Sequence, residues 1–153
     1  MSKPEFVYVI YIHSTPEKIW QALIDPEMTK EFWGRHRNRS DWKVGSAWSH
    51  QNYDDAGDVS VAGTVIESDP PRRLVLTWGH PNETDISRVT FEIEDFMGSA
   101  RLTVTHGDLS PKMLTAISGG WPAVLSSMKT LLETGASLPM TRRNWKKRAE
   151  GVS

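Results

Sequence analysis

The chain has 153 residues, a length that suits one compact domain with its own core. It contains no cysteine, which excludes disulfides, thiolate metal ligands and cysteine nucleophiles and is consistent with a reducing compartment. The formal net charge is −1, and the longest apolar run, Phe6–Ile12, is far shorter than the roughly 20 residues of a membrane span. The first residues do not resemble a secretory leader, so we expect a cytoplasmic protein.

The N-terminal part of the chain predicts one strand followed by two helices. Residues 5–13 are β-branched and aromatic, which is typical of a strand. Thr15-Pro16 supplies an N-cap and a first-turn proline, so a helix begins there, and Asp25-Pro26 ends it. A second, short helix is then expected through Trp33.

The middle of the chain alternates apolar and polar residues between turn signals, which indicates an antiparallel meander. Strands are expected at 37–42, 46–53, 58–68, 72–79, 85–95 and 99–107. The stretch Asp54–Gly57 has the composition of a hairpin turn. Alternation puts these apolar residues on one covered face: Leu74, Leu76, Trp78, Val89, Phe91, Ile93, Leu102 and Val104.

The C-terminal part predicts the cover of that face. Residues 110–133 read as helical, and we expect Gly119-Gly120 to divide them into a short turn and a main helix from Trp121-Pro122. Gly135 is placed as the C-terminal cap. Residues 136–153 have no periodicity and carry five basic residues against Glu150. The predicted organisation is one domain over 1–135 and a basic tail over 136–153.

The order of strand, two helices, meander and long helix defines an α+β fold of the helix-grip type, with a curved sheet of about seven strands around the C-terminal helix. The segments that carry a family resemblance are TPEKIWQAL (15–23), SDWKVGSAW (40–48), GTVIE (63–67), DPPRRLVLTW (69–78), RLTVTH (101–106) and GGWPAVLSSMKTLLE (119–133). In this order they resemble the START-like (SRPBCC) superfamily, and within it the branch of activator-of-Hsp-ATPase homologues. The stretch at 40–48 is most similar to bacterial members associated with ArsR-type regulators.

Seven tryptophans in a chain of this length indicate a wide core or a lined cavity. Trp20 belongs to the apolar stripe of the first helix and is expected in the core. Trp42 has no assigned place, and Trp145 lies in the tail as a docking or disordered residue. The candidate wall of a cavity between sheet and C-terminal helix is Trp33, Trp48, Trp78, Phe91, Trp121, Leu125 and Met128, with plain core packing as the alternative.

Three histidines are candidates for an orienting polar contact in that cavity. Alternation places His50 on the side of Trp48, His80 on the side of Trp78, and His106 on the side of Val104. The alternative, which is the commoner case for a histidine at a strand end, is that each is simply solvated. His106 is the leading candidate of the three.

No known cofactor signature is present in the sequence. The five histidines form no HxH or HxxxH pair, and there is no GxGxxG, Walker or GxSxG motif, so we expect neither a metal nor a nucleotide cofactor. Arg35, Arg37 and Arg39 form a basic group beside Glu31 and Asp41, which favours solvated charge over nucleic-acid binding.

Three functions follow, in order of preference. The first is binding of a small hydrophobic ligand in the cavity, without catalysis. The second, which the resemblance implies, is a stress-response module that contacts a chaperone or a transcriptional regulator. Independently of the function, a sheet edge or the basic tail offers a surface for homodimerisation. The third, also implied by the resemblance, is a cyclase-type or hydrolase-type enzyme that uses the cavity histidines as acid and base.

Overall fold

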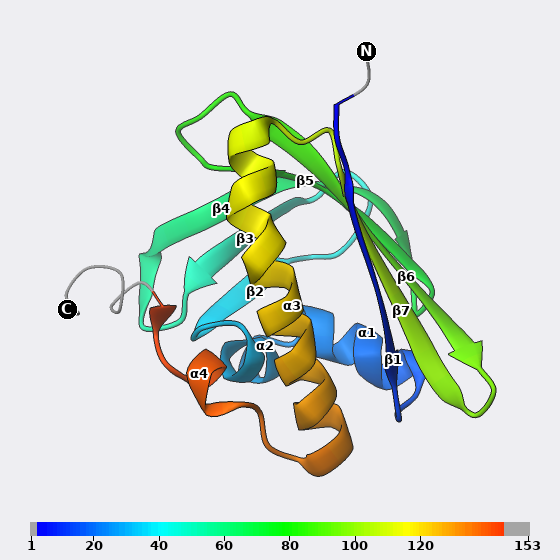
Figure 1. Ribbon diagram of the computed structural model, residues 1–153. Coiled ribbons are helices and arrows are strands. Elements are labelled where there is room, and N and C mark those ends of the chain that lie inside the picture. Colours follow the sequence, from blue (N-terminus) through cyan, green and yellow to red (C-terminus); the bar gives the residue numbers. More distant parts are fainter. Residues whose placement is uncertain (1–2, 146–153) are drawn as a thin grey trace.

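A curved antiparallel sheet wraps around one long helix in the computed structural model, which describes residues 3–145 (Figure 1). The strands are β1 (Phe6–Ile12), β2 (His36–Ser40), β3 (Ala47–Asn52), β4 (Asp55–Asp69), β5 (Arg73–Gly79), β6 (Ile86–Phe96) and β7 (Ser99–Gly107). The helices are α1 (Pro16–Ile24), α2 (Pro26–Phe32), α3 (Pro111–Thr134) and α4 (Pro139–Arg142). The seven strands lie in the order β1-β7-β6-β5-β4-β3-β2, which confirms the predicted α+β helix-grip architecture.

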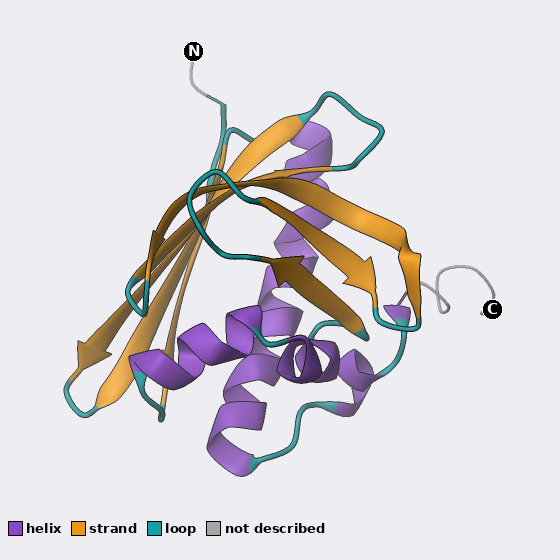
Figure 2. Cartoon of the chain, turned by 180° about the vertical axis from the view of Figure 1, so that it is seen from behind, coloured by secondary structure: helices purple, strands orange, loops and turns teal. Residues whose placement is uncertain are grey.

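α1 and α2 begin and end where the sequence predicts, and α3 spans the residues predicted to be helical, whereas α4 was not predicted. The Thr15 side chain accepts a hydrogen bond at the start of α1, and the Asp25 side chain does the same at the start of α2. Ser110 caps α3 in the same way, while Gly135 ends that helix in the left-handed conformation at φ 90°. α1 and α2 pack at one end of the sheet, beside α3 (Figure 2).

The predicted division of α3 at Gly119-Gly120 is wrong, because α3 is one continuous helix of 24 residues. Two glycines and the internal Pro122 cost an isolated helix about 1 and 3 kcal/mol per residue, respectively. Tertiary packing outweighs that cost here, since Ile117 and Trp121 are buried on the same face as Leu125.

The predicted turn at Asp54–Gly57 is also displaced. β4 already begins at Asp55, so the chain reverses between Asn52 and Asp55. The Asn52 side chain accepts a hydrogen bond from the backbone N–H of Asp54, at 3.0 Å, and this contact closes a tighter turn than composition alone indicates.

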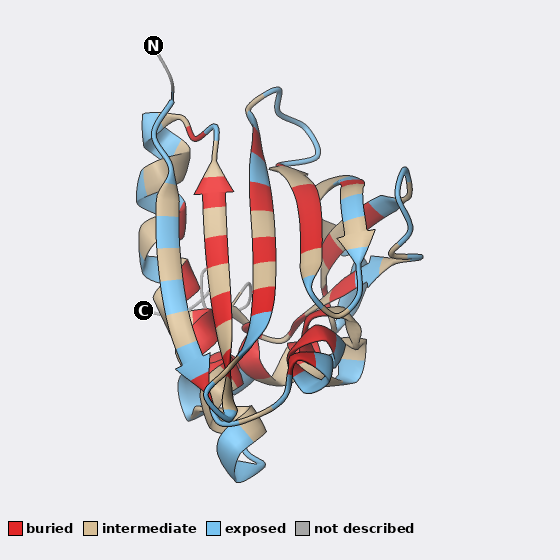
Figure 3. Cartoon of the chain, turned by 90° about the vertical axis from the view of Figure 1, so that its right-hand side faces the viewer, coloured by how far each residue is buried: buried red, intermediate tan, exposed pale blue. Residues whose placement is uncertain are grey.

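The predicted alternation of the sheet is confirmed. Buried residues alternate with exposed or half-buried ones along β6 and with half-buried ones along β7, as Figure 3 shows by colour. The inward-facing residues of these two strands pack beneath α3, and this side holds the fully buried Leu102, Val104, Leu125 and Met128. Trp20 lies in the same core, as predicted.

Residues 136–145 run back from the end of α3 along the outside of the domain. We call them the C-terminal strap. The strap contains α4, which packs against α2 and α3 (Figure 1). Residues 146–153 of the sequence-defined tail lie outside the described part of the chain. Within residues 3–145, no helix has the length and apolar character to cross a membrane.

Candidate functional site

Four tryptophans from separate parts of the chain meet between the sheet and α3. Trp33 follows α2, Trp48 lies on β3, Trp78 on β5 and Trp121 on α3, and we call them the indole cluster. The Trp78 ring is central: its centroid lies 5.5 Å from those of Trp48 and Trp121, and 6.4 Å from that of Trp33. These spacings are typical of favourable aromatic pairs. The fold thus brings together four residues that were predicted as cavity walls and that are far apart in the sequence.

The indole cluster lies where a cavity was expected, and a groove opens beside it at the edge of α3. The groove has a volume of about 150 Å³. It is lined by Trp33, Trp78, Ala116, Ile117, Gly120, Trp121, Val124 and Trp145. None of these described lining residues carries a charge. Three indoles of the cluster therefore present ring surface to an apolar recess.

A second hollow continues the groove, and its lining includes charged side chains. This outer pocket, of about 290 Å³, shares Trp78, Ala116 and Ile117 with the groove. Its other lining residues are Ser60, Val61, His80, Glu83, Asp85, Lys112 and Met113. The two hollows together offer an apolar end and a mixed polar end, which is the usual composition of a small-molecule site.

His106 is completely buried beside the indole cluster, with both ring nitrogens engaged. Trp121 Nε1–H donates to His106 Nδ1 at 3.0 Å, so the proton of the neutral ring is on Nε2, which lies 2.7 Å from Ser87 Oγ. Burial lowers the pKa of His106 to about 4. A neutral imidazole with no free nitrogen is suited to fixing the Trp121 ring rather than to moving a proton.

His50 is also buried, at the other side of the indole cluster. Its ring stacks on His36 at 5.0 Å between centroids and lies 4.8 Å from Trp33. His50 Nδ1 is 2.7 Å from Asn38 Oδ1, and His36 Nδ1 is 2.8 Å from the carbonyl of Gly34. Burial, and secondarily the neighbouring His36, lower the pKa of His50 to about 3. His50 therefore packs against Trp33 as a neutral ring.

The remaining candidates differ in position. The inward direction predicted for His50 and His106 is confirmed, whereas His80 is exposed after β5 and reaches only the rim of the outer pocket. Phe91 packs edge-on against Trp121 at 5.8 Å. Leu125 and Met128 are fully buried in the core and do not line the groove.

Sequence reasoning did not include Ala116, Gly120 and Trp145 among the site residues. Ala116 and Gly120 have small side chains, which do not by themselves suggest a binding role. A glycine inside a continuous helix can nevertheless indicate a close approach or a recess. Trp145 follows an aperiodic stretch, and nothing in the sequence pairs it with Gly34. Within residues 3–145, no group of three or more metal-ligating side chains is present.

The geometry defines a class of protein, an α+β helix-grip domain with an apolar groove beside its long helix. The model of the family "Activator of Hsp90 ATPase homolog 1-like protein" matches residues 13–133, which is most of the chain. The chain therefore belongs to this family. No curated protein matches the sequence significantly.

Solved structures share the fold at low sequence identity. The solution structure of CalU16 from Micromonospora echinospora has a TM-score of 0.75 at 18% identity, with 91% of this chain and 71% of that chain covered. The Aha1 dimer from Colwellia psychrerythraea gives 0.71 at 21%, covering 86% and 98%. An HSP90 activator from Plasmodium falciparum gives 0.70 at 21%, covering 84% and 96%. At such identities the similarity concerns the fold alone.

Proposed function

We propose that this protein binds a small, largely apolar molecule in the groove beside α3. The observation that carries the proposal is the groove itself, an uncharged recess of about 150 Å³ onto which Trp33, Trp78 and Trp121 open. Burial of a ligand against these rings removes apolar surface from water, which contributes about 25 cal/mol per Å². The polar residues of the outer pocket would receive the hydrophilic end of such a ligand.

The indole cluster makes this groove a preorganised site. Its rings are held by each other and by hydrogen bonds, including Trp121 to His106 and Trp48 Nε1 to the carbonyl of Thr77 at 2.7 Å. A ligand therefore meets walls that are already ordered, and it does not have to offset the entropy of ordering them. In this function His50 and His106 act as positioning residues of the indole walls.

The test is a binding titration with N-phenyl-1-naphthylamine, an uncharged fluorescent probe. We expect saturable binding to the wild-type protein with energy transfer from tryptophan. Ala116→Leu adds volume to the wall shared by the groove and the outer pocket, and should weaken binding about tenfold or more, which corresponds to about 1.4 kcal/mol.

The matched control is Thr115→Leu, which places the same side chain on the adjacent exposed position of α3. Thr115 lines neither hollow, so this variant should bind the probe as the wild type does. Absence of binding to the wild type, or equal binding by the two variants, would contradict the proposed function.

A second candidate is an interaction module for a chaperone of the Hsp90 class. It is favoured by the family match together with an apolar stripe on the edge strand β1, where Val7, Val9 and Tyr11 are each about half exposed. An exposed stripe of this kind on an edge strand is available for pairing or docking.

The second candidate is tested by the ATPase rate of a purified Hsp90. Addition of the wild-type protein should raise the rate, and Val9→Ser should remove the stimulation while leaving probe binding in the groove unchanged. An ATPase rate that does not respond to the wild-type protein would eliminate this candidate and leave the ligand-binding proposal untouched.

A further inference from the structure

Trp145 forms a wall of the groove that belongs to the C-terminal strap and not to the sheet or α3. Its ring lies directly against Gly34, which has a positive φ of 62°. A Cβ atom at position 34 would overlap the Trp145 ring, so the residue at the end of α2 has to be glycine for the ring to lie in this place. The ring position therefore depends on a specific close approach.

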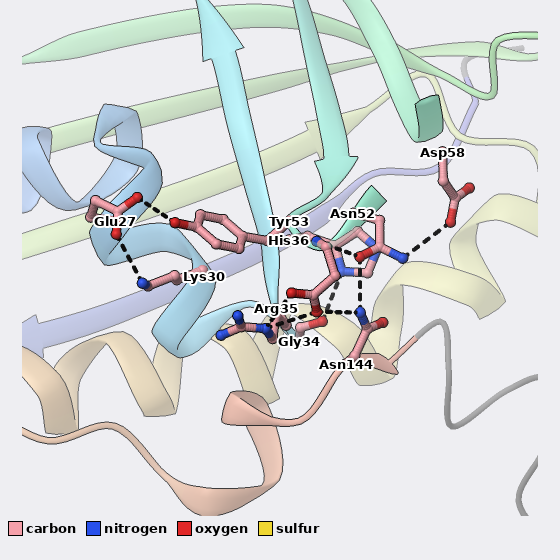
Figure 4. Close-up of polar contacts among 10 residues, drawn as sticks. Glu27, Lys30, Gly34, Arg35, His36, Asn52, Tyr53, Asp58 and Asn144 are labelled. Carbon is pink, nitrogen blue, oxygen red and sulfur yellow. Dashed lines mark hydrogen bonds and ion pairs between the residues drawn. The ribbon is translucent and has the colours of Figure 1, made fainter. Parts of the chain in front are cut away.

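Hydrogen bonds on both sides of that contact hold the strap to the domain. The Gly34 N–H donates to the carbonyl of Thr141 at 2.8 Å, and the Trp145 N–H donates to the carbonyl of Gly34 at 3.0 Å. Asn144 Nδ2 donates to Asn52 Oδ1 at 2.8 Å and to Asp54 Oδ2 at 3.0 Å, as the dashed lines at Asn144 in Figure 4 show. These bonds fix the strap against the β3–β4 turn.

The ring nitrogen of Trp145 is directed away from any ligand. Its Nε1–H donates to the carbonyl of Met140 within the strap, at 2.9 Å. The Nε1–H of Trp121 is likewise engaged, with His106. These two walls therefore offer a ligand their carbon surface and π electrons, and they offer no indole hydrogen bond. Flat aromatic rings interact best with such surfaces, by offset stacking or edge-to-face contact.

The size of the groove limits what can enter it. A closed cavity of about 150 Å³ is known to hold one benzene-sized molecule. The groove has this volume and opens into the outer pocket through their shared wall, so a second fused ring can follow the first. Saturated rings of the same carbon skeleton are thicker because their carbons are puckered.

We propose that Trp145 is a specificity-determining residue that makes the groove selective for planar aromatic ligands over saturated ones. The inference rests on the proposed function, because it names the class of ligand for the same groove. Gly34 is a positioning residue in this arrangement, since it allows the Trp145 ring to lie where it forms the wall.

The experiment compares 2-naphthol with decahydro-2-naphthol by calorimetry. The two probes share a carbon skeleton and a hydroxyl group and differ in planarity. We expect the wild-type protein to bind 2-naphthol about tenfold more tightly. Loss of one aromatic wall in Trp145→Ala should weaken 2-naphthol binding about three- to tenfold and change decahydro-2-naphthol binding less than about twofold.

Two further variants separate selectivity from folding. Trp145→Phe keeps an aromatic wall and should retain most of the preference for 2-naphthol. Gly34→Ala keeps the tryptophan but displaces its ring, and should lower the preference as Trp145→Ala does, with the fold checked by circular dichroism. Trp42→Phe, at a tryptophan outside the groove, is the control and should bind as the wild type does.

The outcomes distinguish the two proposals. Equal affinities of the wild type for both compounds, or an unchanged preference in Trp145→Ala, would overturn the role of Trp145 while the proposed function stands. If the wild type binds neither compound and also fails to bind N-phenyl-1-naphthylamine, both proposals are wrong. A preference that Trp145→Ala and Gly34→Ala both reduce would support the inference.

Discussion

The two halves of α3 face the same sheet but form different contacts with it. The C-terminal half packs beside β1, and Leu125 and Met128 are completely buried there. The N-terminal half lies opposite β4 and β5 and carries Ala116 and Gly120, where the groove and the outer pocket open. One helix thus seals one side of the domain and leaves the other accessible.

Small residues on α3 therefore produce the recess, and it is not a gap in the fold. A Cβ at Gly120 would have no neighbour within 4 Å, and the same is true of Gly119. The indole cluster lies behind this opening. Its rings take the place that aliphatic side chains such as Leu125 and Met128 take on the sealed side. Accessibility and rigidity therefore coexist on the groove side.

The largest expected effect is on the sealed side. Leu125→Ala should lower the free energy of unfolding by about 2–5 kcal/mol, because it leaves a cavity among fully buried neighbours. Ile117→Ala, beside the groove, removes a side chain that already faces a hollow and should cost less, about 1–2 kcal/mol. Urea denaturation measures both. Equal losses would mean that the two sides do not differ in packing.

Acidification should destabilise the groove side through two buried histidines, His50 and His106, which both lie beside the indole cluster. The pKa values of about 3 for His50 and about 4 for His106 lie below the 6.5 of the unfolded chain, so the unfolded state binds more protons in between. Stability is complete above about pH 6.5 and falls by about 1.4 kcal/mol per pH unit for each histidine as the pH decreases. At pH 5.5 the two together should cost about 3 kcal/mol.

Urea denaturation of the wild type and of His106→Gln, between pH 7.5 and 5, measures this slope. The variant should show about half of the wild-type dependence, since one of the two depressed pKa values is gone. A wild-type stability that stays constant down to pH 5 would show that these rings are not buried as neutral groups.

Attachment of the strap should contribute less than the core. Ser127 is fully buried on α3, its Oγ lies 2.6 Å from Thr141 Oγ1, and it accepts a hydrogen bond from the Leu138 N–H at 2.9 Å. Ser127→Ala leaves that N–H without its partner and should cost about 1–3 kcal/mol. Thermal unfolding measures the loss, with Ser126→Ala at the half-buried neighbouring position as the control. A loss no larger than that of the control would show that attachment of the strap contributes little to the free energy of unfolding.

The sheet is the part of the fold that sequence reasoning predicts well. Strict alternation along β6 and β7 locates Phe91, Val104 and His106, because one face of each strand has to be covered. The groove was harder to predict. α3 is continuous because tertiary packing offsets the cost of Gly119-Gly120. Helix propensities describe only local sequence, so they do not predict this packing. The place of Trp145 depends on a contact with Gly34, over a hundred positions earlier in the chain, and aperiodic residues give no signal of such a contact.

The smallest expected effect compares the two adjacent glycines of α3. Gly119→Ala and Gly120→Ala should each raise the free energy of unfolding by about 0.5–1 kcal/mol, since alanine lowers the entropy of the unfolded chain and neither new Cβ meets a neighbour. Gly120 lines the groove and Gly119 does not, so only Gly120→Ala adds a methyl group to the wall and should weaken binding of N-phenyl-1-naphthylamine. Thermal unfolding and the probe titration, made on the same samples, check the two effects separately. Equal stabilisation with unequal binding would assign the glycine at 120 to the recess, whereas equal binding would indicate that the recess is not where the ligand lies.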